Sequence, residues 1–171
     1  MKAGVAWSSI LSLVGCAGYP SGVEPVGGFE LDRYLGTWYE IASLDHGFER
    51  GLSRVTAEYS LNDDGTVKVV NRGFLADRGE WKEAVGKAKF AGSPEQGYLK
   101  VSFFGPFYGS YVIFDLDEDY EYAFISGPNT GYLWLLARRP DLRQDVIDDF
   151  VAKAEAAGFR VEKLVMVDHQ E

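Results

Sequence analysis

Few residues of this 171-residue chain could do chemistry: it has one cysteine, Cys16, and two histidines, His46 and His169. A single cysteine excludes an internal disulfide and any metal or redox site built from paired cysteines. Two histidines offer little for metal binding or acid–base catalysis, and we expect no metal and no other cofactor. The chain also has no catalytic-triad spacing and no nucleophile elbow. The chemistry left open is modification of the cysteine itself, or binding without covalent chemistry.

Cys16 comes after a segment unlike the rest of the chain. Residues 1–15 carry one charge, on Lys2, followed by an apolar run that ends in Leu13-Val14-Gly15. A basic start, a short apolar middle and small residues at the end are typical of a secretory signal. The run is too short to span a bilayer as a helix, which needs about 20 residues.

The segment Leu13-Val14-Gly15-Cys16 resembles the lipobox of bacterial lipoproteins. The resemblance implies a signal peptide over residues 1–15, lipidation of the Cys16 thiol, and durable anchoring by two or three acyl chains. The residue after Cys16 is Ala17 and not aspartate, so the resemblance also implies that the protein is sorted to the outer membrane and anchored on its periplasmic face. The alternative is an ordinary buried cysteine. Residues 16–29 are rich in Gly and Pro and predict a lipidated, flexible tether.

Residues 30–171 are expected to form one all-β domain. Short strands alternate with turn signals such as Asn62-Asp63-Asp64-Gly65, a pattern typical of an antiparallel sandwich or barrel. Eight strands in meander order can close on themselves and remove both sheet edges. A helix from Pro140 to Gly158 with one apolar face is expected outside the barrel, before a short final strand at 163–167. The expected strands are residues 36–44, 54–61, 67–74, 83–90, 98–104, 110–116, 121–126 and 132–138.

Three motifs along these strands resemble those of the lipocalin family. Gly36-Thr37-Trp38 resembles its G-x-W motif, residues 117–120 resemble the second motif, and Arg138 the third. From residue 31 onward the chain is similar to the bacterial outer-membrane lipoprotein members of that family. The resemblance implies an eight-stranded antiparallel up-and-down barrel. We expect one end of it to be a closed, structural base with the Arg138 guanidinium over the Trp38 indole; its residues are Gly36, Trp38, Asp119, Tyr120 and Arg138.

Alternation of side chains along barrel strands predicts which residues line the interior. With Trp38 inward, the lining residues are Glu40, Ala42, Val55, Ala57, Tyr59, Val69, Asn71, Gly86, Ala88, Leu99, Val101, Phe103, Tyr111, Ile113, Ile125, Trp134 and Leu136. Several are small, and an apolar interior with open space suits a hydrophobic ligand. The alternative is a barrel filled by its own side chains.

Glu40 is the polar exception in this interior. A buried carboxylate needs a partner, which a tyrosine hydroxyl or Arg138 could supply. Its charge would repel a ligand carboxylate, so an acyl ligand is expected to enter tail first, with its head group at the mouth.

The loops opposite the base are expected to form the mouth. Phe107 and Tyr108 would gate it or stack on an entering chain, or else pack on their own hairpin. Arg50 and Arg54 would meet an anionic head group, or else be ordinary surface residues. His46, on the first mouth loop, is expected to be a surface residue.

Net charge narrows the class of partner. At −9 the chain is too acidic for nucleic acid. The expected function is binding of a fatty acid or lysophospholipid for storage or transport in the cell envelope, by a protein held at the membrane through its N-terminal acyl anchor. The alternatives are a lipocalin-fold enzyme acting on a hydrophobic substrate and a structural envelope lipoprotein. A homodimer is one alternative for its oligomeric state.

Overall fold

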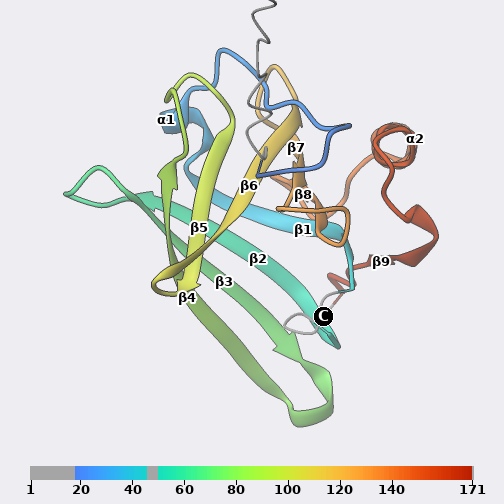
Figure 1. Cartoon of the computed structure of the whole chain (residues 1–171). Helices are drawn as coiled ribbons and strands as arrows, with labels where there is room; N and C mark the ends of the chain where they lie inside the picture. Colours follow the sequence, from blue (N-terminus) through green and yellow to red (C-terminus); the bar gives the residue numbers. More distant parts are fainter. Residues whose placement is uncertain (1–17, 46–49, 171) are drawn as a thin grey trace, which may run out of the picture.

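The computed structural model describes residues 18–45 and 50–170. Cys16, the expected signal peptide and His46 lie outside the described residues. Eight antiparallel strands succeed one another in meander order, and β1 pairs with both β8 and β2, so that the sheet closes into a barrel (Figure 1). The all-β barrel expected from the sequence is thereby confirmed. The strands are β1 (Gly36–Leu44), β2 (Leu52–Leu61), β3 (Val67–Leu75), β4 (Glu80–Phe90), β5 (Tyr98–Phe104), β6 (Phe107–Leu116), β7 (Tyr122–Ser126) and β8 (Leu133–Ala137).

Alternation of apolar and charged residues sets the register where the strands are regular. Val69 is buried and pairs with Gly86, whereas the neighbouring pair Lys68 and Lys87 is exposed. A shift of one residue would bury these lysines. The charged residues on the outer face therefore specify the pairing of β3 with β4.

Register shifts interrupt this alternation in four strand pairs, β1–β8, β2–β3, β5–β6 and β6–β7, and two of them change the facing of residues expected at the site. On β1, Glu40 pairs with Leu136 but Ala42 pairs with Leu135, so Ile41 is the inserted residue. An inserted residue reverses the facing of the residues after it. Ala42 consequently packs outside the barrel, in the cluster that contacts the C-terminal helix, and its expected place in the interior is wrong. The second bulge lies on β2 between Ser53 and Thr56.

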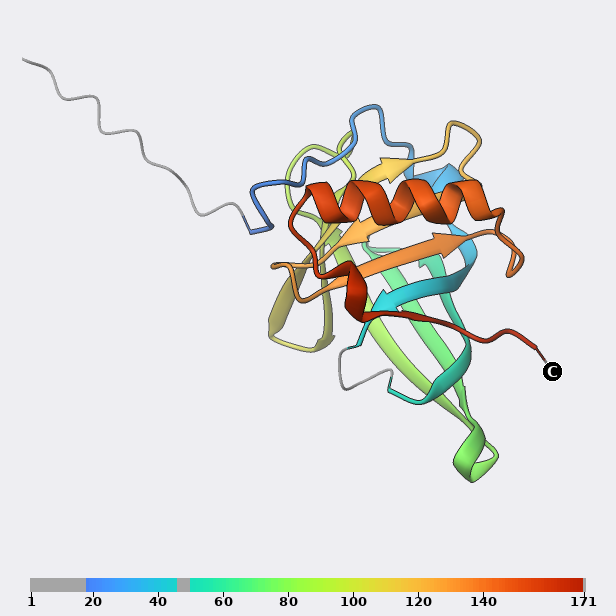
Figure 2. The ribbon, with the colours of Figure 1, turned by 90° about the vertical axis from the view of Figure 1, so that its right-hand side faces the viewer.

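The C-terminal helix, α2, covers the outside of the barrel, as Figure 2 shows. It runs over Gln144–Ala156 and begins later than expected, because Arg143 still has an extended backbone. Its buried face carries Phe150, which is fully buried and packs edge-on against Phe124 of β7 at 5.1 Å between ring centroids. After the short helix η2 (Val161–Lys163), β9 (Leu164–Met166) adds to the sheet beside β1. No helix in residues 18–45 or 50–170 is long and apolar enough to cross a membrane.

Gly158 ends α2 in the left-handed conformation, with φ of +88° and its N–H bonded to the Glu155 carbonyl at 3.0 Å. A side chain there is strained, so Gly158→Ala is expected to lower the free energy of unfolding by about 1 kcal/mol. Urea denaturation measures the change. As a control, Glu155→Ala on the exposed face of the helix should stay within about 0.5 kcal/mol of the parent; equal losses in both variants would contradict the role given to Gly158.

The N-terminal strap (residues 18–29) is docked on the barrel. Val26 donates to the Ile113 carbonyl at 2.9 Å and accepts from Gly97 at 2.9 Å, and Phe29 donates to Glu95 at 2.9 Å. Val23 is buried in the outer cluster. The expectation of a flexible tether is therefore wrong for residues 18–29, because apolar residues between the glycines and prolines anchor it. A short helix, α1 (Leu31–Tyr34), and β1 come next, and the 3-10 turn η1 (Ala76–Arg78) joins β3 to β4.

Candidate functional site: a cavity closed at one end

Arg138 holds the closed end of the barrel together. Its guanidinium lies 3.9 Å from the centroid of the Trp38 ring. The same group donates hydrogen bonds to the carbonyl oxygens of Tyr120 (3.2 Å), Thr37 (3.0 Å) and Arg33 (2.7 Å). Arg138 thus connects β1, α1 and the turn before β7. Burial lowers its pKa from the usual value, which leaves an arginine charged at neutral pH.

The turn between β6 and β7 supplies the rest of this base. Asp117 Oδ2 accepts hydrogen bonds from the backbone N–H of Asp119 (3.0 Å) and of Glu121 (3.2 Å). Tyr120 has a positive φ of 60° and is buried, with the Arg33 guanidinium 4.2 Å from its ring centroid. Gly36, with φ of +96°, brings the start of β1 close to the Arg138 guanidinium. These contacts support a structural role for the base.

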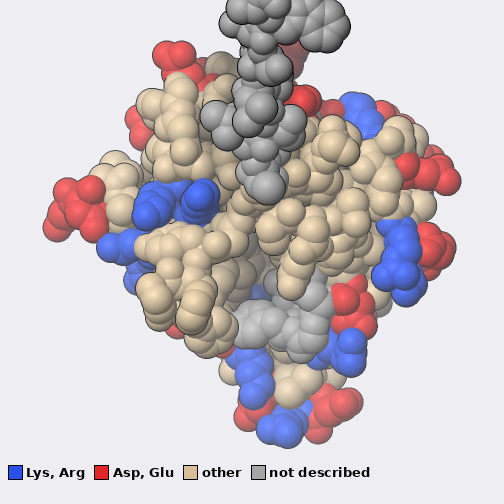
Figure 3. All heavy atoms as spheres, in the orientation of Figure 1, with Lys and Arg blue, Asp and Glu red and all other residues tan. Residues whose placement is uncertain are grey.

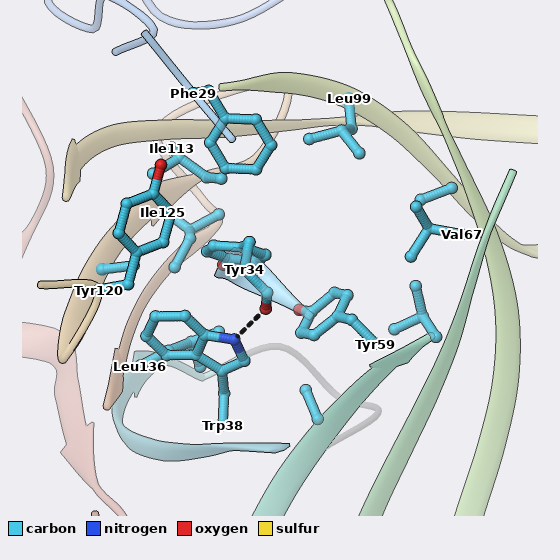
Figure 4. Packing of buried hydrophobic residues seen from close by; sticks show 14 residues of the cluster. Phe29, Tyr34, Trp38, Tyr59, Val67, Leu99, Ile113, Tyr120, Ile125 and Leu136 are labelled. Carbon is cyan, nitrogen blue, oxygen red and sulfur yellow. Dashed lines mark hydrogen bonds between the residues drawn. The ribbon is translucent and has the colours of Figure 1, made fainter. Parts of the chain in front are cut away.

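Inside the barrel, between the base and the mouth, tyrosines and Trp38 form a packed layer that we call the floor of the cavity (Figure 4). Trp38 Nε1 donates to the Tyr34 carbonyl at 2.8 Å. The Tyr111 hydroxyl hydrogen-bonds to those of Tyr34 (2.7 Å) and Tyr59 (2.8 Å). Burial, followed by the neighbouring phenols, raises the pKa of Tyr111 well above 10.0, and burial likewise raises that of Tyr34. Both phenols are therefore neutral at physiological pH and keep their protons above pH 10 in the folded protein.

These raised pKa values predict how stability depends on pH. The unfolded chain loses tyrosine protons near pH 10 while the fold keeps those of Tyr34 and Tyr111, so stability falls as pH rises through 10. Each retained proton should contribute a slope of about 1.4 kcal/mol per pH unit. Phenolate absorbance should show at least two tyrosines that ionise only when the barrel unfolds, whereas all 10 ionise together in denaturant. Ionisation of all of them in the intact fold would contradict the buried network.

A cavity of about 460 Å³ lies between this floor and the mouth. This volume is within the usual range for small-molecule pockets, about 300–1,000 Å³. Of the residues expected inside, those on the cavity wall are Glu40, Ala57, Tyr59, Val69, Asn71, Val101, Phe103, Tyr111, Trp134 and Leu136. The wall also includes residues that strand alternation did not predict: Thr56, Phe104, Gly109, Ser110, Pro128 and Tyr132. Most of these stand at a bulge or a turn, where strand alternation gives no signal.

Other residues expected in the barrel interior do not border the cavity. Ala88, Leu99, Ile113 and Ile125 belong to the packed interior cluster and not to the cavity wall. Gly86 leaves no space, because a Cβ there would lie 2.9 Å from the Phe103 ring. Val55, at the β2 bulge, is buried but belongs neither to that cluster nor to the wall. The barrel is therefore solid at one end and open at the other.

Two polar side chains stand out on the cavity wall. Glu40, whose side chain is only 4% exposed, contributes a carboxylate. Asn71 Oδ1 is buried and accepts no hydrogen bond from the described residues. The three described hydrogen bonds of the Arg138 guanidinium go to backbone carbonyl groups, so this arginine serves the base.

The mouth is aromatic. Phe104 and Phe107, which flank the turn between β5 and β6, are 73% and 79% exposed and border the cavity. Pro128 and Tyr132 border it from the turn between β7 and β8. Figure 3 shows a hollow in this region with mostly uncharged atoms at its edge.

Three other residues expected at the mouth, Arg50, Arg54 and Tyr108, are not among the residues that line the cavity. Tyr108 is absent from the wall, and its ring centroid lies 4.4 Å from Lys89 Nζ. Arg50 pairs with Asp45 at 3.0 Å. The Arg54 guanidinium lies 4.0 Å from the centroid of the Phe74 ring. The expectation that Arg54 lines the mouth is wrong. Arg54 lies at the β2 bulge with φ of +51°, and its guanidinium packs on the rings of Phe74 and Trp81.

No group of three or more potential metal ligands occurs among residues 18–45 and 50–170. The residues that line the described cavity include no histidine and no cysteine. Its groups are those of a binding site: an apolar surface, a few polar atoms and an open mouth.

Comparisons with known proteins agree with this architecture. Residues 29–169 match the family model described as a lipocalin-like domain. The chain is 57% identical over 159 residues to the outer membrane lipoprotein Blc of Vibrio cholerae, covering 92% of this chain and 93% of that protein. It is 51% identical over 148 residues to the protein of the same name in Escherichia coli K12, covering 86% and 84%.

A solved structure shares the fold at lower sequence similarity. Insecticyanin from Manduca sexta superimposes with a TM-score of 0.70 at 21% identity, over 87% of this chain and 85% of that one. The names of the bacterial relatives also agree with the outer-membrane location expected from the sequence. By its fold, its motifs and its relatives, the chain belongs to the lipocalin family.

Proposed function

We propose that this lipocalin binds a lipid with one acyl chain, a fatty acid or a lysophospholipid, and that it stores or carries that lipid in the cell envelope while anchored through Cys16. The observation that carries the proposal is the cavity of about 460 Å³, lined mainly by apolar and aromatic side chains and open at one end. Burial of apolar ligand surface supplies the affinity at about 25 cal/mol per Å² before the costs of association.

The acyl chain enters first, and the head group stays at the mouth. A carboxylate placed beside Glu40 would bring two acidic groups together in a buried place, where ionising both is costly. Arg50 and Arg54 are engaged with Asp45 and with Phe74, so no arginine clamp for a fatty-acid carboxylate is proposed. This favours a lysophospholipid, whose bulky head group remains in water or among other head groups.

Mass spectrometry of lipid copurified with the chain, followed by equilibrium titration of the lipid-stripped protein, tests the proposal. We expect single-chain lipids to copurify and to bind at micromolar or lower Kd. A photoreactive head group should label residues of the mouth, such as Pro128. Labelling beside Glu40 would contradict the orientation, and failure of every single-chain lipid to bind would contradict the function and favour a structural envelope lipoprotein.

The alternative of an enzyme rests on His46, which lies outside the described residues. Turnover of a hydrophobic substrate that disappears on His46→Ala would support it. Binding that survives this substitution, without turnover, is the result expected for a binding protein.

A further inference from the structure

We propose that the aromatic lip (Phe104 and Phe107) enters the same bilayer that holds the acyl anchor, so that the cavity opens directly onto membrane lipid. The inference rests on the proposed lipidation of Cys16. It adds a second membrane contact and an orientation of the barrel, which acyl anchoring by itself does not provide.

The first observation is the path of the N-terminal strap. Going backward along the chain, Phe29 bonds to Glu95 at the closed end and Val26 bonds to Ile113. Gly18 then lies against β5 and β6, since a Cβ on it would be 2.8 Å from both Ser110 Oγ and the Tyr98 hydroxyl. β6 runs from the mouth toward the base, so the step from Ile113 to Ser110 leads toward the mouth. The docked strap therefore carries the chain from the closed end toward the lip.

The distances are short. Ser110 is three residues along β6 from Phe107, roughly 10 Å at the rise of a β-strand. Cys16 is two residues before Gly18, a span of about 7 Å at most. Acyl chains on Cys16 would thus enter the membrane within a few residue lengths of the lip. A flexible tether would impose no such proximity.

The second observation is the chemistry of the lip. Two phenylalanine side chains are more than 70% exposed at one turn, where a soluble surface would not place them together. Beside them, Lys89 Nζ lies 4.4 Å from the Tyr108 ring centroid. Tyrosine and lysine with apolar bodies and polar tips suit the head-group level of a bilayer. The turn therefore has an apolar tip and an amphipathic flank.

Net charge limits the kind of membrane. At −9 the chain is repelled by an anionic surface, so the attraction at the lip must be apolar. The partner of the aromatic lip is therefore a zwitterionic lipid surface.

The test uses the mature lipidated chain, in which acylation of Cys16 leaves an introduced cysteine as the one free thiol. Gly105→Cys places a fluorophore at the tip of the lip, and Gly92→Cys places the same fluorophore on the turn between β4 and β5 at the closed end. Both glycines have room for a Cβ: nothing lies within 4 Å at Gly105, and the nearest atom at Gly92 is 3.7 Å away. Each protein is reconstituted in phosphatidylcholine vesicles that carry nitroxides on their acyl chains.

We expect the nitroxides to quench most of the emission at position 105 and little at position 92. In the Gly105→Cys background, the double change Phe104→Ser and Phe107→Ser should reduce quenching to the level seen at position 92. Equal, weak quenching at 105 and 92 would overturn the proposal. So would emission at 105 that is shielded without vesicles and depends on protein concentration, because a second copy would then cover the lip.

Failure of the proposed function gives different signals. If Cys16 carries no acyl chains, no variant floats with the vesicles, and the proposal falls together with the anchor. If the cavity binds no lipid, titration without vesicles shows it, while the quenching at position 105 is unaffected. Membrane contact and ligand binding are thus measured separately.

Discussion

Arg138→Met is expected to lower the free energy of unfolding by about 3 kcal/mol, the largest loss we predict for a residue outside the hydrophobic clusters. Methionine retains part of the packing on Trp38 but removes the cation over its ring and the three hydrogen bonds to Tyr120, Thr37 and Arg33. Hydrogen bonds from charged donors contribute about 1.5–3 kcal/mol each, and water reaches some of the freed carbonyls. The melting temperature should fall by roughly 6–12 °C, as calorimetry would measure.

The neighbouring arginine provides a matched control. Arg139 pairs with Asp141 on the surface, with both side chains at least 70% exposed, and such pairs contribute about 0–1 kcal/mol. Arg139→Met should therefore leave the free energy of unfolding nearly unchanged. Arg138→Lys keeps the charge but loses the planar guanidinium, so its free energy of unfolding should lie between those of the parent and of Arg138→Met. Equal melting temperatures for Arg138→Met and Arg139→Met would show that the base does not depend on this guanidinium.

Ala57→Trp is expected to weaken binding of a single-chain lipid by roughly a hundredfold or more, about 2.7 kcal/mol. Ala57 lies on the cavity wall opposite Asn71 of β3. An indole there would occupy space that the acyl chain needs, and a packed interior of fixed shape does not expand to accommodate both. Val69→Trp, on the next strand, should have the same effect for the same reason. Isothermal titration of the lipid-stripped variants measures the loss.

Because each tryptophan could also disturb folding, a third variant separates the two effects. Val85 is 52% exposed on the outer face of β4, so Val85→Trp adds the same side chain without entering the cavity. It should bind lipid with the parental affinity, and all three variants should show the circular dichroism of a folded barrel. Parental affinity in folded Ala57→Trp and Val69→Trp would exclude this cavity as the lipid site.

Sequence patterns predicted which side chains face inward on regular strands and failed where the strands are irregular. On β3 the alternation of Val69 and Asn71 with exposed Lys68 identified the inward face. On β1 the same alternation failed at Ala42, because one inserted residue reverses the facing of the residues after it. No local residue type marks that insertion. It is stabilised by the packing of Ala42 and Leu135 beneath α2.

Cys16 shows the same division between local and long-range information. Its leader and its neighbours are local features, and they predict an anchor. Where the anchor would lie relative to the mouth depends on the strap, whose glycines and prolines suggest flexibility. Docking of the strap requires contacts such as the hydrogen bond between Val26 and Ile113, two residues that are 87 positions apart in the sequence.

The sequence by itself determined the class of fold, the strands, the closed base and the family, because those depend on periodicity and on motifs that each act within a short segment. Only the tertiary structure decided how much of the interior stays open, which wall residues the bulges redirect, and where the strap runs. Each of these depends on side chains from distant strands competing for one space. Phe103 occupying the place beside Gly86 is an example, since neither residue's own segment reveals that they meet.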